Sequence, residues 1–314
     1  MSYNSALTRR RVAWLMSTAL VGILGLSATG QAADPAAKPG RATPRTAPNR
    51  KAAPAPPKPR MIVLDPGHGG PDPGTIGVSG YYEKNVVMVA AREMARQLNA
   101  TGRYKAVLTR SGDRYIALRD RVARARSAKA ELFVSVHADS HPNHWTRGAS
   151  VYTLSEGASD REAAALAAKE NKADIVAGVD FRGKPPDITS ILIDLSQRET
   201  VNLSRTFAGI LVDALAHNGI GLLGRSHRHA GFAVLTAPDT PAVLLEMGYL
   251  SNRQDERLLV QTAHIRRLAD AIVDAADRYF ASRPPIPDAK PPAPGISTPP
   301  PASPTRPGPA AKKA

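Results

Sequence analysis

Residues 60–74 read RMIVLDPGHGGPDPG, an apolar run that stops at a Pro-Gly pair. The uninterrupted apolar residues from Met61 to Leu64 are typical of a short buried strand, and Pro66-Gly67 indicates a loop directly after it. His68 lies inside that loop, next to glycines. The stretch therefore predicts a strand whose carboxyl end carries a histidine.

An alternation of helices and strands follows this strand. Apolar residues recur at helical spacing from Glu83 to Leu98, which predicts a helix. A second strand, a basic amphipathic helix and a third strand are predicted next, at residues 105–109, 116–128 and 132–136. This order is the signature of a parallel sheet flanked by helices. We therefore expect an α/β domain with a mostly parallel, twisted sheet, flanking helices, and an active site at the carboxyl edge of the strands.

The remainder of the region predicts further elements of both kinds. The stretch SDREAAALAAKENKADIVAG reads as one long helix, with Ser159 as N-cap and Glu162 as its capping-box partner. Strands are predicted at residues 149–154, 232–235 and 242–245, and helices at 195–218 and 255–280. Residues 60–282 are therefore predicted to form one folded domain.

Both ends of the chain are too poor in bulky residues to build a core. Three arginines, an apolar run from Val12 to Leu26 and the small residues up to Ala32 match an export signal, residues 1–32. The alternative is an uncleaved membrane anchor, although 15 apolar residues are short of the ~20 that a spanning helix needs. Thr8-Arg9-Arg10 also partly fits a twin-arginine signal. Proline-rich basic segments, residues 33–59 and 283–314, are predicted to be disordered.

Most of the net charge of +15 lies in these two ends, which carry +8 and +4 and leave +3 on the folded region. A basic core face would suggest nucleic acid, but the core has no such stripe or motif, so we expect no nucleic-acid partner. The chain has no cysteine. Any metal site must therefore use histidines and carboxylates.

Four polar residues stand where this topology places ligands. His68 and His137 each follow a predicted strand, Glu83 opens the helix after the glycine-rich loop, and Glu246 follows the strand at 242–245. Taken singly, each has another interpretation: a hydrogen-bonded histidine, a carboxylate favoured at a helix start, or a partner for an arginine. Their joint placement favours a metal site.

The motifs VLDPGHGGPDPG, YYEKNVV, ELFVSVHADS and PAVLLEMGYLSN, in this order, resemble the zinc-dependent N-acetylmuramoyl-L-alanine amidases of the amidase-3 type. The resemblance covers residues 60–280. It implies that His68, Glu83 and His137 bind Zn²⁺ and that Glu246 is the catalytic glutamate. It also implies hydrolysis of the amide between N-acetylmuramic acid and L-alanine in peptidoglycan, in the periplasm, during wall remodelling and daughter cell separation.

Residues 159–194 form a longer connection than the fold requires, and they resemble the inserted helical segment of the cell-separation amidases. That resemblance implies self-inhibition by a glutamate at the zinc, relieved by a LytM-type activator protein. Glu170 is our candidate for this glutamate, and Glu162 is the runner-up. A surface carboxylate on an alanine-rich helix is the alternative. We expect the protein to act as a monomer.

Other interpretations remain open from the sequence. A site of two histidines and one glutamate would also suit a zinc carboxypeptidase acting on the stem peptide, and a wall-binding module without catalysis is the non-enzyme alternative. Asp65 and Asp139 could orient the histidines or be ordinary turn carboxylates. Arg110 could bind a substrate carboxylate or a carbonyl at the sheet edge.

Overall fold

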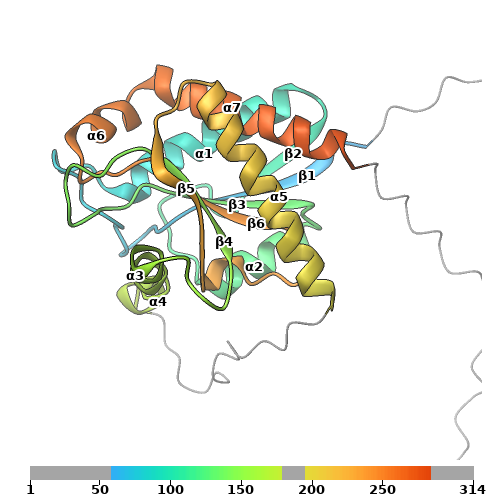
Figure 1. Ribbon diagram of the computed structural model, residues 1–314, viewed down its shortest axis with the longest axis horizontal. Coiled ribbons are helices and arrows are strands. Elements are labelled where there is room, and N and C mark those ends of the chain that lie inside the picture. The colour runs from blue at the N-terminus through green and yellow to red at the C-terminus, as the bar shows by residue number, and fades with distance from the viewer. Residues whose placement is uncertain (1–57, 179–194, 284–314) are drawn as a thin grey trace, which may run out of the picture. The chain divides into compact units, whose positions relative to one another are not determined.

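A computed structural model of the chain describes residues 58–178 and 195–283, shown as coloured ribbons in Figure 1. Its strands are β1 (Arg60–Pro66), β2 (Tyr104–Leu108), β3 (Leu132–His137), β4 (Ala149–Leu154), β5 (Leu222–Ala230) and β6 (Ala242–Glu246). Its helices are α1 (Glu83–Ala100), α2 (Leu118–Ser127), α3 (Arg161–Glu170), α4 (Ala173–Val176), α5 (Leu195–His217), α6 (Arg253–Leu259) and α7 (Thr262–Ala281), with a 3-10 turn η1 (Ala233–Leu235).

The strands form one sheet in the order β2-β1-β3-β6-β4-β5. The strands β2, β1, β3 and β6 run parallel to one another, β4 is antiparallel to β6, and β5 is parallel to β4. The mostly parallel α/β sheet predicted from the sequence is therefore confirmed. The register sets Pro66 beside Val136 and His137 beside Glu246, so the carboxyl ends of β1, β3 and β6 meet at one edge.

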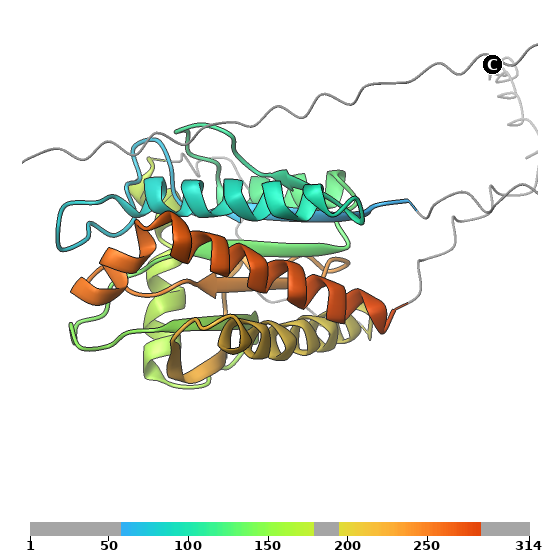
Figure 2. The same ribbon diagram turned by 90° about the horizontal axis from the view of Figure 1, so that it is seen from above.

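Alternate residues of the central strands are buried on opposite faces of the sheet. Ile62 and Leu64 pack in the core under α1, α5 and α7, whereas Val63 packs on the other face with residues of α2 and α3. Figure 2 shows α1, α7 and α5 lying side by side over their face. Because a shift of one residue would exchange the two faces, this two-sided core fixes the strand register and hence the edge that carries the polar residues.

Several element predictions in the second half of the chain are wrong in detail. Residues 233–235 form the turn η1 rather than part of a strand, and β5, which was not predicted, lies just before it. The strand β5 is at the edge of the sheet, and few of its side chains are buried, so its sequence is too polar to show a strand pattern. The predicted closing helix is two helices, α6 and α7.

The predicted long helix after β4 is also two helices, α3 and α4. Its N-cap is Asp160 and not Ser159: the Asp160 side chain accepts a hydrogen bond of 2.8 Å from the Ala163 N–H. The helix α3 therefore starts one residue later than the capping-box pattern predicts.

In the described part of the chain, no helix is both long and apolar enough to cross a membrane. The predicted signal segment (1–32) lies outside the described residues, as do nearly all of the two proline-rich segments and residues 179–194 of the predicted insertion.

Candidate metal centre and catalytic site

Four buried polar side chains meet at the carboxyl edge of the sheet. His68 lies in the loop after β1, and Glu83 is the first residue of α1. His137 and Glu246 end β3 and β6 and stand next to each other in register. The structure thus brings together the four residues that the sequence singled out, from elements that are far apart along the chain.

Glu83 lies between the two histidines. Its Oε1 is 3.1 Å from His68 Nε2 and 3.2 Å from His137 Nδ1. Its carboxylate also accepts hydrogen bonds of 2.9 Å from the backbone N–H groups of Thr75 and Ala138. These backbone contacts hold the carboxylate so that one oxygen faces both rings.

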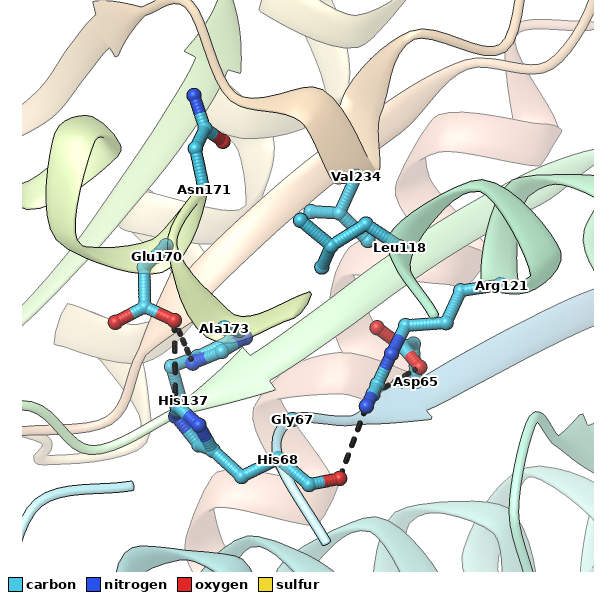
Figure 3. Close-up of a pocket in the computed structure, with 10 residues that line it drawn as sticks. All are labelled: Asp65, Gly67, His68, Leu118, Arg121, His137, Glu170, Asn171, Ala173 and Val234. Atoms are coloured by element: carbon cyan, nitrogen blue, oxygen red, sulfur yellow. Dashed lines mark hydrogen bonds and ion pairs between the residues drawn. The ribbon is translucent and has the colours of Figure 1, made fainter. Parts of the chain in front are cut away.

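A fifth polar side chain, Glu170, reaches the histidines from α3. Its Oε2 lies 3.6 Å from His68 Nε2 and 3.3 Å from His137 Nδ1, as the dashed lines in Figure 3 show. The cavity that these three residues help to line has a volume of about 10 Å³, close to the least that holds one water molecule. Glu170 therefore closes the centre to anything larger than a small ion or a water.

Glu162, the runner-up for this position, lies elsewhere. Its Oε2 accepts a hydrogen bond of 2.9 Å from Arg228, and its Oε1 is 3.6 Å from His141 Nε2. Its side chain is more than half exposed. Of the two glutamates, only Glu170 contacts the histidines of the centre.

The spacing of the donor atoms fits a tetrahedral metal ion. Zinc–ligand bonds of about 2.1 Å set neighbouring ligand atoms about 3.4 Å apart, and the four distances from the two carboxylates to the two histidine nitrogens run from 3.1 to 3.6 Å. His68 Nε2, His137 Nδ1 and Glu170 Oε1 are buried without a hydrogen-bond partner among the described residues. Such unpaired buried groups cost about 1–3 kcal/mol each, so a bound cation would satisfy atoms that the chain leaves unsatisfied.

The loop that carries His68 has a strained backbone. His68 has a φ of 58°, a left-handed conformation that costs a non-glycine residue of order 1–3 kcal/mol. Its Nδ1 is 2.8 Å from Asp72 Oδ2, and the other oxygen of Asp72 accepts a hydrogen bond from the Gly74 N–H. A Cβ at Gly67 would collide with the ring of His137, so glycine there lets the two histidines approach each other.

Asp72 has the orienting role that the sequence offered to Asp65 or Asp139. The carboxylate of Asp65 instead accepts hydrogen bonds from Thr109, Ser135 and Arg121. The only sequence signal for Asp72 was its place four residues after His68, within the same glycine- and proline-rich loop.

Two buried arginines bind the backbone of the His68 loop, a role that the sequence left open for Arg110 and did not assign to Arg121. Arg121 donates to Asp65 and to the carbonyls of residues 66 and 68, at 2.9 Å each. Arg110 donates to the carbonyls of residues 66 and 67, at 2.9 and 2.7 Å. Of the two roles left open for Arg110, the structure thus shows the carbonyl contact. Burial lowers the pKa of Arg110 to about 10.

Glu246 and Asp139 connect the centre to α3. One oxygen of Glu246 accepts a hydrogen bond of 3.0 Å from the Asp139 N–H, and the other is buried without a partner among the described residues. The Asp139 carboxylate accepts a hydrogen bond of 3.0 Å from the Thr75 hydroxyl and pairs with Lys169, the residue before Glu170. This ion pair ties the end of α3 to the sheet edge.

Burial and charge oppose each other at His68 and Glu83 and act together at Glu246. Burial would lower the pKa of His68, but the charges of Glu83 and Glu170 raise it well above its ordinary value. Burial would raise the pKa of Glu83, but the two histidines hold it well below the usual range. Burial, together with the charges of Glu83 and Glu170, raises the pKa of Glu246 well above that of an ordinary glutamate. Glu246 is thus the carboxylate of the site that most readily takes up a proton.

The fold and the site together define an α/β protein with a buried histidine–carboxylate centre, suited to a metal ion, at the carboxyl edge of its sheet. The model of the family described as N-acetylmuramoyl-L-alanine amidase (Amidase_3) matches residues 62–278. The chain belongs to this family.

Curated relatives share the whole folded region. The amidase AmiA of Escherichia coli K12 is 41% identical over 224 residues, which cover 70% of this chain and 76% of AmiA. AmiC of Neisseria meningitidis serogroup B is 40% identical over 224 residues, 70% of this chain and 52% of AmiC. The chain therefore spans about half the length of that AmiC and about three quarters of that AmiA.

Solved structures share the fold. The CwlD amidase of Clostridioides difficile, in complex with the GerS lipoprotein, superimposes with a TM-score of 0.52 and 20% sequence identity over 71% of this chain and 99% of CwlD. At this identity the likeness concerns the fold alone.

Proposed function

We propose that this protein is a zinc-dependent amidase that hydrolyses the bond between N-acetylmuramic acid and L-alanine in peptidoglycan. Membership of the amidase family and 40% identity to named amidases support the reaction. The observation that carries the proposal is the convergence of His68, His137 and Glu83, with unpartnered histidine nitrogens, beside the buried carboxylate of Glu246.

His68, Glu83 and His137 would hold the Zn²⁺. Two histidines and one carboxylate are a common ligand set of catalytic zinc, which keeps a further position for water or substrate. When bound, zinc lowers the pKa of a water to about 7 and polarises the scissile carbonyl. Asp72 would keep His68 in the tautomer that presents Nε2 to the metal, because it binds the other ring nitrogen.

Glu246 would move the proton. Its oxygen without a partner can take a proton from the attacking water and deliver it to the leaving amine of L-alanine. Burial suits this role, since the raised pKa of Glu246 favours uptake of the proton. The backbone N–H of Asp139 orients the second oxygen.

Digestion of purified cell-wall sacculi tests the reaction. Mass spectrometry of the products is expected to show a free L-alanine amine and an intact glycan strand, whereas a zinc carboxypeptidase would release the carboxyl-terminal residues of the stem peptide. Glu246→Gln is expected to bind zinc and to lose hydrolysis. Normal hydrolysis by that variant would contradict the assignment of Glu246.

Glu170 would inhibit the enzyme by occupying the open position of the metal. Its distances to both histidines and the small volume beside it support this role. Activation then requires displacement of α3, for which we propose a LytM-type activator protein as partner. CwlD, an amidase with this fold, has been solved in complex with another protein, the GerS lipoprotein.

Removal of residues 159–194 tests self-inhibition. The shortened protein is expected to fold, bind zinc and hydrolyse sacculi faster than the full chain. A folded, zinc-loaded protein that is no faster would exclude inhibition by this segment.

The arginine-led apolar segment at residues 9–32 supports export, so we place the enzyme in the periplasm, acting as a monomer in wall remodelling and cell separation. Fractionation of cells that produce the full chain tests this: retention in the cytoplasm would contradict it.

A further inference from the structure

A second and larger pocket lies directly beside the metal centre, on the face of the sheet covered by α3. Its volume is about 570 Å³, and its walls include Tyr152 of β4, Arg228 of β5, Leu166 of α3 and Tyr249, which follows β6. The pocket thus combines an apolar, aromatic wall with a guanidinium group. Nothing in the reaction described above uses it.

Arg228 lies on strand β5, so it stays in the pocket when α3 is displaced. Arg161 and Lys169 also line the pocket, but both lie on α3 and would move away with that helix. Arg228 is only 7% exposed, and it donates a hydrogen bond of 2.9 Å to Glu162 and lies 3.6 Å from Asp160. Within the described residues, these two carboxylates are its ion-pair partners, and both belong to α3 and its cap.

Displacement of α3 would therefore leave the Arg228 guanidinium without a carboxylate partner and open to the pocket. A ligand that supplies an anion there can form a charge-assisted hydrogen bond with it. The other side-chain hydrogen bond of Arg228 among the described residues runs from Nε to the Arg225 carbonyl, at 3.0 Å, and does not use the outer nitrogens.

The proposed chemistry places the stem peptide on this side of the centre. Glu246 gives its proton to the leaving amine, and that amine is the first nitrogen of the stem peptide. The Asp139 N–H binds Glu246, and both Asp139 and Tyr249 line the pocket. The stem peptide, whose first nitrogen receives the proton from Glu246, is therefore expected to lie next to this larger pocket.

We propose that Arg228 binds a carboxylate of the stem peptide, and that Glu162 occupies the place of that carboxylate while α3 is closed. The inference rests on the proposed amidase function and names a residue that determines its substrate preference. Glu162 and Glu170 are eight residues apart on α3, a rise of about 12 Å. This length corresponds to about three to four residues of extended peptide, so the bound carboxylate lies within the first few residues of the stem.

Two substrates that differ only in charge test this role: a muramyl tetrapeptide with free carboxylates and the same compound with all carboxylates converted to carboxamides. Both are assayed with the zinc-loaded full chain carrying Glu170→Gln, in which the inhibitory contact is weakened. The measured quantity is the ratio of kcat/KM for the free acid to kcat/KM for the amide. Any change in the fraction of open or folded enzyme affects both substrates equally and cancels in this ratio.

Arg228→Gln is expected to lower the ratio about tenfold or more, mainly through the KM of the free acid, because a charge-assisted hydrogen bond is lost. Arg228→Lys is expected to keep part of the preference. Arg225→Gln is the matched control: Arg225 is on the same strand and lies 3.7 Å from Asp160, but it does not line the pocket, so its loss is expected to leave the ratio unchanged.

An unchanged ratio in Arg228→Gln, or an equal fall in Arg225→Gln, overturns the role of Arg228 and leaves the amidase function intact. If the zinc-loaded Glu170→Gln chain cleaves neither substrate nor sacculi, the proposed function itself fails, and the role of Arg228 falls with it.

Discussion

At the scale of single residues, the position of His68 depends on one contact within its own loop and one with a distant helix. Asp72 binds the ring Nδ1, and Arg121 binds the carbonyl of the same histidine. Because His68 adopts a left-handed backbone, it needs this support to hold one conformation. His68 and the groups that bind its ring and its carbonyl therefore act as one unit.

Asp72→Asn is expected to weaken zinc binding by about 10–100-fold, since the loss of a carboxylate behind a histidine ligand has effects of this size. The measurement is competition with a chromophoric chelator. Asp239→Asn, on an exposed ion pair with Arg126, serves as the control and is expected to leave the affinity unchanged. Equal affinity in Asp72→Asn and the unaltered protein would show that Asp72 does not support the ligand.

Arg121→Met is expected to lower the free energy of unfolding by about 3–5 kcal/mol, because it leaves the buried Asp65 carboxylate without its cation and the His68 carbonyl without this donor. Urea unfolding in the presence of a metal chelator measures this effect apart from zinc binding. Adding Asp65→Asn is expected to recover part of the loss. Arg103→Met, which removes an exposed pair with Asp277, is expected to cost less than about 1 kcal/mol.

At the scale of elements, α3 is the helix that brings Glu170 against the two histidines of the centre. Ala163, Leu166 and Ala167 on its apolar side pack against the sheet. Its carboxyl end carries Glu170 and Lys169, which forms an ion pair with Asp139. Because α3 has only ten residues, small changes in its stability are expected to change the population of the open state.

Asp160→Ala removes the N-cap of α3 and is expected to destabilise the helix by about 1 kcal/mol, which corresponds to about fivefold more open protein. Faster hydrogen exchange of the α3 amides and faster basal hydrolysis are the two measurements. Ser159→Ala is the comparison, because the Ser159 hydroxyl makes no capping bond and accepts instead from the His229 N–H. Equal exchange in both variants would contradict the assignment of the cap.

At the scale of the whole molecule, the metal is expected to contribute to stability. The buried carboxylates of Glu83, Glu170 and Glu246 lie close together, and a cation would offset their mutual repulsion. At a zinc concentration about 1,000 times Kd, the gain is about 4 kcal/mol, or roughly 8–16 °C in Tm for a domain of this size.

Removal of zinc by a chelator is therefore expected to lower Tm by this amount, and added zinc is expected to restore it, as followed by differential scanning calorimetry. His68→Ala is expected to remain folded, bind no zinc at this site and show no zinc-dependent shift. Identical melting curves with and without zinc in the unaltered protein would argue against a metal at this centre.

The fold class and the four central residues could be predicted because they depend on local patterns. Apolar runs that end at His137 and Glu246 mark strand ends, and parallel strands bring their carboxyl ends to one edge. The strand β5 could not be predicted, since an edge strand buries few side chains and its sequence stays polar. The choice of Glu170 over Glu162 depended on how α3 packs against the sheet.

The sequence by itself determined the alternation of elements and which polar residues stand at strand ends, because these features involve residues that are neighbours along the chain. Only the tertiary structure decided that Arg121 binds the His68 loop and that Glu170, rather than Glu162, lies against the histidines. Asp65 and Arg121 are 56 residues apart, and Glu162 and Arg228 are 66 residues apart. Such pairs form only when the strands and α3 have packed together, so no local pattern in the sequence records them.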